Sequence, residues 1–213
     1  MSESLLPILQ NPAVLERTSA ATRRVLEQRG APVASGDRFL TAPLFALLQQ
    51  ITATILPQAA AGTQVDIAAG IDQRLSAGTN AGWRFADLPA DGEAYRKGLT
   101  VFGTMLQQTP MKSFEAMPPA ARGGYLRCVA NGDVDAMAQF PLSRWLGMLR
   151  TDAVKIWMAH PATMQKMEYY GFADGETGQT NGPTDMEGWA GITTNTALPF
   201  EHGIISSAGE QKA

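Results

Sequence analysis

The sequence is poor in the residue types that mark several large classes of protein. Its 213 residues include one cysteine, Cys128, so no internal disulfide forms and the fold does not depend on oxidation. The net charge of −3 offers no basic patch of the kind that attracts nucleic acids or anionic membranes. No apolar run approaches the roughly 20 residues that a membrane span needs. We therefore expect neither a nucleic-acid partner nor a direct membrane span.

An export signal is also not expected. Arg23 and Arg24 form a twin arginine near the start of the chain, but the residues that follow, "VLEQRGAPVASGD", are charged and interrupted. A twin-arginine signal needs an apolar stretch at that point, so we interpret the pair as charge on a helix surface. The predicted location is cytoplasmic, with a periplasmic location as the alternative if the chain is exported together with a partner.

The apolar residues that are present recur at helical spacing. Asn11 is placed to cap a first helix that has Pro12 at its first position and Gly30 just past its end. Further helical patterns occupy "LTAPLFALLQQITATILPQ", "QVDIAAGIDQRLSAG", "DGEAYRKGLTVFGTMLQQ", the second half of "FEAMPPAARGGYLRCVANGD" and "PLSRWLGMLRTDAVKIWMAH". The clearest buried stripe has apolar residues at i, i+4, i+7 and i+11: Tyr95, Leu99, Phe102 and Leu106.

The fold class that follows is all-α. No segment alternates with period two for long, and β-branched residues are not concentrated anywhere. We predict a single-domain bundle of about six helices with a long irregular C-terminal tail. Residues 1–40 would form an N-terminal helix and linker, residues 41–160 the helical core, and residues 161–213 an extended, glycine-rich tail. A structureless segment of that length is usually functional or disordered.

A search for catalytic chemistry finds no convincing constellation. Cys128 lies in the apolar stretch "YLRCV" and is interpreted as a small core residue, and Asp66 and Asp72 as parts of a solvated helix face. There is no G-x-S-x-G elbow, and the glycines of "GFADGETGQTNG" match neither a dinucleotide loop nor a phosphate loop. We therefore expect no catalytic residue and no cofactor-binding residue on this chain, which would not be an enzyme on its own.

Histidine chemistry is limited to His160 and His202. Together with Glu168 they make a thin case for a metal site, because three scattered ligands show no recognisable spacing. His160 stands before Pro161, and this pair reads more simply as a helix stop. We predict no metal site but keep a metal-dependent enzyme as the remote alternative.

Aromatic residues gather where the helical pattern ends. The stretch "WMAHPATMQKMEYYGFADGETGQTNGPTDMEGWAG" carries Trp157, Tyr169, Tyr170 and Trp189. Aromatic residues are enriched at protein interfaces but also fill cores. Trp145 is interpreted as core, whereas for Tyr169, Tyr170 and Trp189 core and interface are equally good readings.

The ordered set of features resembles the small subunit, called subunit 3 or gamma, of gluconate 2-dehydrogenase and related FAD-dependent sugar dehydrogenase complexes. The resemblance rests on an early apolar helix ending in proline ("LLQQITATILPQ"), a short helix after a Val-Asp pair ("QVDIAAGIDQRLSAG") and a "GL" helix ("YRKGLTVFGTMLQQ"). It continues in "FEAMPPAARGGYLRCVANGD" and in "AHPATMQKMEYYGFADG", and it covers about residues 41–200. The series "HP…YYGFADG…GW" is its most specific part.

The resemblance implies an accessory role. In this family the small subunit does no chemistry and binds a large flavoprotein of the glucose-methanol-choline type, which holds FAD and oxidises a sugar hydroxyl. A multi-haem cytochrome c often accepts the electrons, and the small subunit often carries the twin-arginine signal for both chains. This sequence departs from that pattern, because the signal is missing.

These considerations give one leading hypothesis and two alternatives. The leading hypothesis is a non-catalytic subunit that binds and stabilises the FAD-containing catalytic subunit of a sugar, glycoside or polyol dehydrogenase. Its tail would run across the partner as a strap, and such tails order on binding. The predicted interface residues are Trp157, His160, Tyr169, Tyr170, Gly171, Phe172 and Trp189. The alternatives are a transient folding or export chaperone of that flavoprotein and the metal-dependent enzyme.

Overall fold

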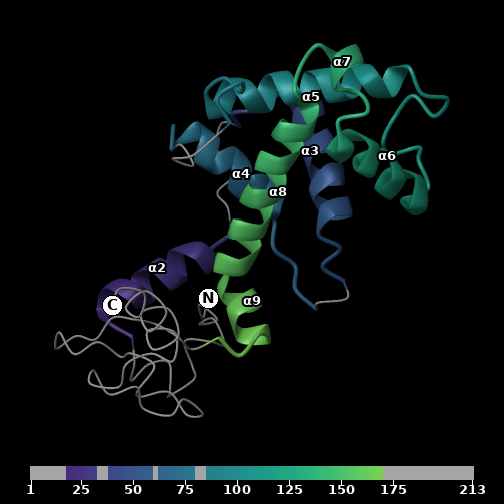
Figure 1. The fold of residues 1–213 in the computed structure, drawn as a ribbon. Helices are drawn as coiled ribbons and strands as arrows, with labels where there is room; N and C mark the ends of the chain where they lie inside the picture. Colours follow the sequence, from purple (N-terminus) through teal and green to yellow (C-terminus); the bar gives the residue numbers. More distant parts are fainter. Residues whose placement is uncertain (1–17, 33–37, 60–61, 80–84, 170–213) are drawn as a thin grey trace, which may run out of the picture. The chain divides into compact units, whose positions relative to one another are not determined.

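The fold is taken from a computed structural model that describes residues 18–32, 38–59, 62–79 and 85–169. The chain divides into two compact units, residues 27–168 and the two ends of the chain, 1–26 with 169–213. The described residues contain eight helices and no strand, which confirms the all-α prediction (Figure 1). The helices are α2 Ala20–Gly30, α3 Ala42–Ile55, α4 Ile67–Ser76, α5 Asp91–Gln107, α6 Pro119–Asn131, α7 Asp135–Ala138, α8 Leu142–Ala159 and α9 Pro161–Lys166.

Helix α8 is the centre of the 27–168 unit. It packs against α4 and α6 most closely and also contacts α3, α5, α7 and α9 (Figure 1). Its inner face buries Leu142, Trp145 and Leu149 completely, in agreement with the periodicity of the sequence. A helix whose apolar stripe is wide enough to meet several neighbours is held mainly by that burial rather than by its own propensity.

Helix α5 supplies the second layer of the core. Its predicted stripe Tyr95, Leu99, Phe102 and Leu106 is buried along its whole length. Phe102 lies at the middle of an aromatic group, with ring centroids 5.7 Å from Phe114, 5.2 Å from Tyr125 and 6.0 Å from Trp145. Edge-to-face ring pairs, such as Phe102 with Phe114 and Phe102 with Tyr125, contribute more to stability than the burial of their apolar area alone. The stripe therefore joins α5 to α6, α8 and the loop between α5 and α6.

The crossing of α5 and α8 depends on a glycine. The indole of Trp145 lies directly on Gly98, where a Cβ atom would come within 2.3 Å of Trp145 Nε1. Real Cβ atoms do not approach ring atoms so closely, so only glycine permits this contact. The close approach explains how so large a side chain becomes fully buried between two helices.

Helix ends follow the local chemistry of the sequence. Asp66 caps α4 by accepting a hydrogen bond from the Ala69 amide at 3.0 Å. Gly132 ends α6 in the left-handed conformation at φ +83°, at the Asn131-Gly132 end that the sequence predicts. The predicted start of the first helix, at Pro12, lies outside the described residues.

Two sequence interpretations are wrong. Cys128 is exposed rather than in the core, because α6 turns Leu126 and Val129 inward and leaves the thiol on its outer side. Asp72 is buried rather than solvated, and its carboxylate accepts hydrogen bonds from the backbone amides of Phe39 and Leu40 at 3.2 and 2.9 Å. It thereby fixes the segment that leads into α3.

Two short helices, α7 and α9, were not among the predicted ones. Helix α9 occupies the start of the region expected to be extended, because Pro161 serves as a first helical residue rather than only as a stop. The division into residues 1–40, 41–160 and 161–213 otherwise stays a prediction. No described helix combines the length and the apolarity that a bilayer span requires.

Candidate functional site

A largely buried ionic centre lies between α4, α5 and α8 in the 27–168 unit. Arg74 Nη1 donates to Asp91 Oδ2 at 2.8 Å, and Arg74 Nη2 donates to Asp152 Oδ2 at 2.6 Å. The Tyr95 hydroxyl donates to the same Asp152 oxygen at 2.7 Å. The two carboxylates are almost wholly buried, with side-chain exposures of 3% and 5%. We call these four residues the ionic centre.

Three helices position the four residues of the ionic centre, with Asp91 and Tyr95 both on α5. Arg74 belongs to the last turn of α4, Asp91 is the first residue of α5, and Asp152 lies in the middle of α8. Arg74 Nη1 also donates to the carbonyl of Thr79, 3.0 Å away, and so ties down the chain just after α4. A guanidinium has several donors in a fixed plane, which lets one side chain bridge two helices and a loop.

The electrostatics of the ionic centre favour a charged Arg74 and a neutral Tyr95. Burial raises the pKa of Tyr95 well above its usual value, and the Asp152 charge and hydrogen bond raise it further, so the hydroxyl stays a neutral donor. Burial alone would lower the pKa of Arg74, but the Asp91 hydrogen bond and the Asp152 charge outweigh it and raise the pKa. The centre thus holds one cation, two carboxylates and a neutral phenol.

This arrangement is that of a structural clamp. Asp152 accepts hydrogen bonds from Arg74 and Tyr95, and Asp91 accepts one from Arg74. Each carboxylate is therefore already engaged by a strong donor. A general base must reach a substrate proton, and its pKa must lie near the working pH. The ionic centre instead joins three helices whose sequence separations reach 78 residues. Its chemistry is suited to fixing the packing angle of α4 and α5 on α8.

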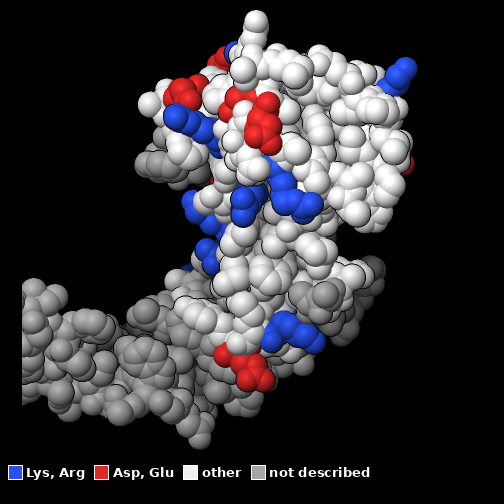
Figure 2. All heavy atoms as spheres, turned by 45° about the vertical axis from the view of Figure 1, so that its right-hand side comes forward, with Lys and Arg blue, Asp and Glu red and all other residues white. Residues whose placement is uncertain are grey.

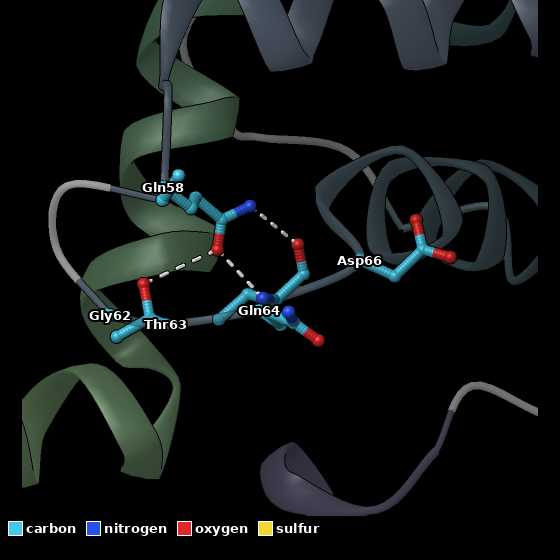
Figure 3. Close-up of a pocket in the computed structure, with 7 residues that line it drawn as sticks. Gln58, Gly62, Thr63, Gln64 and Asp66 are labelled. Carbon is cyan, nitrogen blue, oxygen red and sulfur yellow. Dashed lines mark hydrogen bonds between the residues drawn. The ribbon is translucent and has the colours of Figure 1, made fainter.

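A second polar feature is the loop between α3 and α4 (Figure 3). The Gln58 side chain spans this loop: its Nε2 donates to the Val65 carbonyl at 2.8 Å, and its Oε1 accepts from the Val65 amide at 2.7 Å. Thr63 donates to the same Gln58 oxygen at 3.4 Å. The residues that make these bonds, together with Gln64 and Asp66, line an open hollow of about 560 Å³. The backbone of the loop is thus held by one amide side chain.

Trp157, one of the predicted interface residues, is tied to this loop. Its ring is half-buried against the core of the 27–168 unit, and its Nε1 donates to Thr63 Oγ1 at 3.0 Å. Thr63 itself is buried. A contact between residues 94 positions apart in the sequence binds the end of α8 to the α3–α4 loop. The indole therefore has an intramolecular role, and its role as a partner anchor stays a prediction.

His160, also predicted at the interface, occupies the corner between α8 and α9. It ends α8 in an extended conformation, which confirms the helix stop. Its Nδ1 accepts a hydrogen bond from the Ala162 amide at 3.2 Å and so caps α9. Burial lowers the pKa of His160, which favours the neutral ring that this cap needs.

The other predicted interface residues are only partly within view. Tyr169 is 48% exposed. Tyr170, Gly171, Phe172 and Trp189 lie outside the described residues, as does the strap that they were expected to form. His202, one of the three candidate metal ligands, also lies outside the described residues, so the structure does not test that site. Within the described part of the chain, no group of three or more His, Cys, Asp or Glu side chains is arranged to hold a metal.

Two residues in the sequence indicate the ionic centre, although the sequence analysis did not predict it. Asp152 falls three residues after Leu149 and seven after Trp145, so an acidic residue stands inside the apolar stripe of α8. Tyr95 likewise lies inside the stripe of α5 and carries a hydroxyl that needs a buried partner. A charge and a hydroxyl at core positions of two helices together indicate a buried polar contact. Arg74 could not have been identified as the third member without the fold.

Comparison with known proteins decides the family. The model of the gluconate 2-dehydrogenase subunit 3 family matches residues 42–175, which is more than half of the chain. The chain belongs to the gluconate 2-dehydrogenase subunit 3 family. The matched region begins at the first residue of α3 and contains the ionic centre, the α3–α4 loop and all of α8. No curated protein and no solved structure gives a significant match.

Proposed function

We propose that this family member is a non-catalytic subunit that binds and stabilises the FAD-containing catalytic subunit of a sugar, glycoside or polyol dehydrogenase. The observation that carries the proposal is the family match over residues 42–175, because the family is described as the third subunit of a dehydrogenase. A subunit of such an enzyme has other chains to bind. The catalytic partner we propose is of the glucose-methanol-choline type.

The chemistry of the described residues supports an accessory role. The ionisable groups of the ionic centre are engaged with one another. His160 is engaged in capping α9. These groups are the ones that an independent acid–base enzyme would use, and here they maintain the fold. We propose accordingly that the chain carries no cofactor and that the flavin, and in some assemblies haem c on a cytochrome subunit, belongs to its partners.

Purification from the native host tests the proposal. The full chain, tagged and isolated gently, should bring down a larger yellow protein in equimolar amount, and haem-stained bands would add a cytochrome. A visible spectrum and a denaturing gel give both readouts. A colourless chain that arrives alone, stable and monodisperse, would contradict the proposal.

The chaperone alternative and the location need separate measurements. A chaperone would leave its client after folding, so it would bind newly made flavoprotein and be missing from the mature enzyme. We propose a cytoplasmic location for the chain, or a periplasmic one if it leaves the cell interior bound to its partner. Cell fractionation with and without the gene for the flavoprotein separates these two cases.

A further inference from the structure

Helix α3 is exposed along one side but contains no charged residue. Its sequence is APLFALLQQITATI, and the charge-free run around it extends from Phe39 to Val65, the longest in the chain. Surface helices normally turn a charged or polar face to solvent, and helices that are apolar all round are normally buried. Yet Ala42, Ala46 and Ala53 of α3 are exposed. The exposed side of α3 thus carries alanine, proline and glutamine where surface helices usually carry charged residues.

Helix α5 extends this uncharged surface. The second-longest charge-free run of the sequence, Gly98 to Met111, belongs to α5 and the residues just after it. The two helices are in contact, and a Cβ atom at Gly103 would lie 3.7 Å from a methyl group of Leu47. Both residues are half-buried, so this contact lies at the surface. We define the α3–α5 face as Ala46, Leu47 and Gln50 of α3 with Thr100, Gly103 and Thr104 of α5.

The hydroxyl groups on this face already have partners. Thr100 donates to the Arg96 carbonyl at 2.8 Å, and Thr104 donates to the Thr100 carbonyl at 3.0 Å. Such bonds to the preceding turn satisfy the hydroxyl within its own helix. Burying a polar group is costly mainly when its hydrogen bond is lost, so these threonines can be covered at little cost. Gln50 is the member of the face whose amide would need a partner.

Two cations stand at the end of the face where α3 begins. The Arg38 guanidinium lies 3.7 Å from the centre of the Phe45 ring, and the Arg96 guanidinium lies 3.8 Å from the centre of the Phe39 ring. Neither arginine belongs to an ion pair among the residues that the structure describes. The described carboxylate nearest to Arg96 along α5 is Glu93, one turn earlier. An uncharged centre with cations at its rim is the charge pattern of a protein interface.

We propose that the α3–α5 face is the surface by which this subunit docks on the flavin-containing catalytic subunit, against an uncharged patch that presents carboxylates to Arg38 and Arg96. This inference rests on the proposed function and specifies its interface. A second copy of the chain is a poorer occupant, because the six residues of the face include no carboxylate and Glu93 at the rim is one acidic residue against two arginines. Complementary charge at a rim fixes the register of a complex and speeds its formation.

The test uses the tagged full chain in its native host, with the co-purified flavin as the readout. Ala46→Glu in α3 and Thr104→Glu in α5 place a carboxylate at the centre of the face. The matched control is Thr151→Glu on α8, because Thr151 is also exposed and its hydroxyl makes the same kind of bond, to the Gly147 carbonyl at 3.0 Å. Thermal unfolding followed by circular dichroism checks that all three variants fold.

We expect Ala46→Glu and Thr104→Glu to lower the flavin recovered per chain by about tenfold or more, and Thr151→Glu to leave it unchanged. Arg38→Glu should lower recovery less, with the greatest loss at low ionic strength, where repulsion between carboxylates is least screened. Folded Ala46→Glu and Thr104→Glu chains that recover the wild-type amount of flavin would overturn the inference. Loss confined to Thr151→Glu would move the interface to α8 and overturn it as well.

Other outcomes separate this inference from the proposed function. A wild-type chain that recovers no flavoprotein contradicts the proposed function itself. If the wild-type chain is a dimer that Ala46→Glu converts to a monomer, with flavin recovery unchanged, the face binds a second copy of the chain. Flotation with phosphatidylglycerol vesicles that is lost in Ala46→Glu, again with flavin recovery unchanged, would give it to a lipid surface. Both results would overturn the docking of the catalytic subunit on this face.

Discussion

The ionic centre and the α3–α5 face distribute charge in opposite ways, and both invert the usual rule. In the ionic centre, two buried aspartates and a half-buried arginine lie among the helices. On the α3–α5 face, the residues exposed to solvent are uncharged. Soluble proteins normally place charge outside and apolar groups inside. The contrast teaches that buried charge here fixes how the subunit's own helices pack, whereas the uncharged exterior is suited to contact with another protein.

Cutting the ionic centre should have the largest effect on stability. Asp152→Ala leaves the half-buried Arg74 charge with one carboxylate and leaves the buried Tyr95 hydroxyl without its acceptor, so the free energy of unfolding should fall by about 3–5 kcal/mol. The contrasting variant is Asp87→Ala, which breaks the exposed Arg144–Asp87 ion pair. It should cost no more than about 1 kcal/mol. Urea unfolding of both variants measures the difference, and equal losses would refute the clamp.

Removing one hydroxyl should sharpen the same point with a smaller effect. Tyr95→Phe keeps the ring in the core but deletes the hydrogen bond to Asp152, at a cost of about 1.5–3 kcal/mol. Because burial raises the pKa of Tyr95 above its unfolded value of 10, its contribution is complete below pH 10. It is lost as the pH rises through the folded-state pKa. The stability gap between the wild type and Tyr95→Phe should therefore narrow in strong alkali, as measured by urea unfolding at several pH values.

Glycine substitutions compare a buried crossing with the exposed face. Gly98→Ala forces a methyl group into the Trp145 indole, and the resulting overpacking should cost about 1–3 kcal/mol. Gly103→Ala meets Leu47 at an ordinary contact distance, so the better helix propensity of alanine should stabilise the chain by about 0.5–1 kcal/mol. Melting temperatures of the two variants should thus move in opposite directions. A melting temperature that does not fall in Gly98→Ala would show that the α5–α8 crossing tolerates more than its geometry suggests.

The smallest expected effect concerns the cap of α9. Because burial lowers the pKa of His160, the neutral ring and its cap are fully present above the unfolded pKa of 6.5. The cap is lost as the pH falls through the folded-state pKa, and stability should then drop by about 1 kcal/mol or less. His160→Asn retains an acceptor that does not titrate, so it should flatten this acid limb in chemical unfolding curves. An unchanged acid limb would assign the drop to other groups.

Local pattern was sufficient to predict the helical core but not its polar contents. The buried stripe of α5 and the burial of Trp145 follow from periodicity alone. Apolar residues that recur on one side of a helix turn that side toward the core. Asp72 was misplaced because its burial depends on amides more than thirty residues away, at Phe39 and Leu40. Such long-range partners leave no trace in a local window. The same reason hid Arg74, whose two carboxylate partners lie on other helices.

Prediction of the candidate interface was limited by a different cause. Aromatic side chains attract attention as binding residues, and Trp157 was chosen for that reason, yet its Nε1 is used within the chain. The uncharged α3–α5 face consists of alanine, leucine, glutamine, glycine and threonine, which no motif marks. Its signal in the sequence is the length of the two charge-free runs, and only the fold shows that these runs lie side by side.

The exposed position of Cys128 makes the subunit suitable for distance measurements by energy transfer. It is the only thiol in the sequence and lies on the outer side of α6, so a maleimide dye should attach at one site without prior mutagenesis. Flavins absorb blue light and quench suitable donors by energy transfer, and the efficiency reports the separation between dye and flavin. In the flavoprotein complex that we propose, a labelled subunit would thus measure the distance between α6 and the flavin.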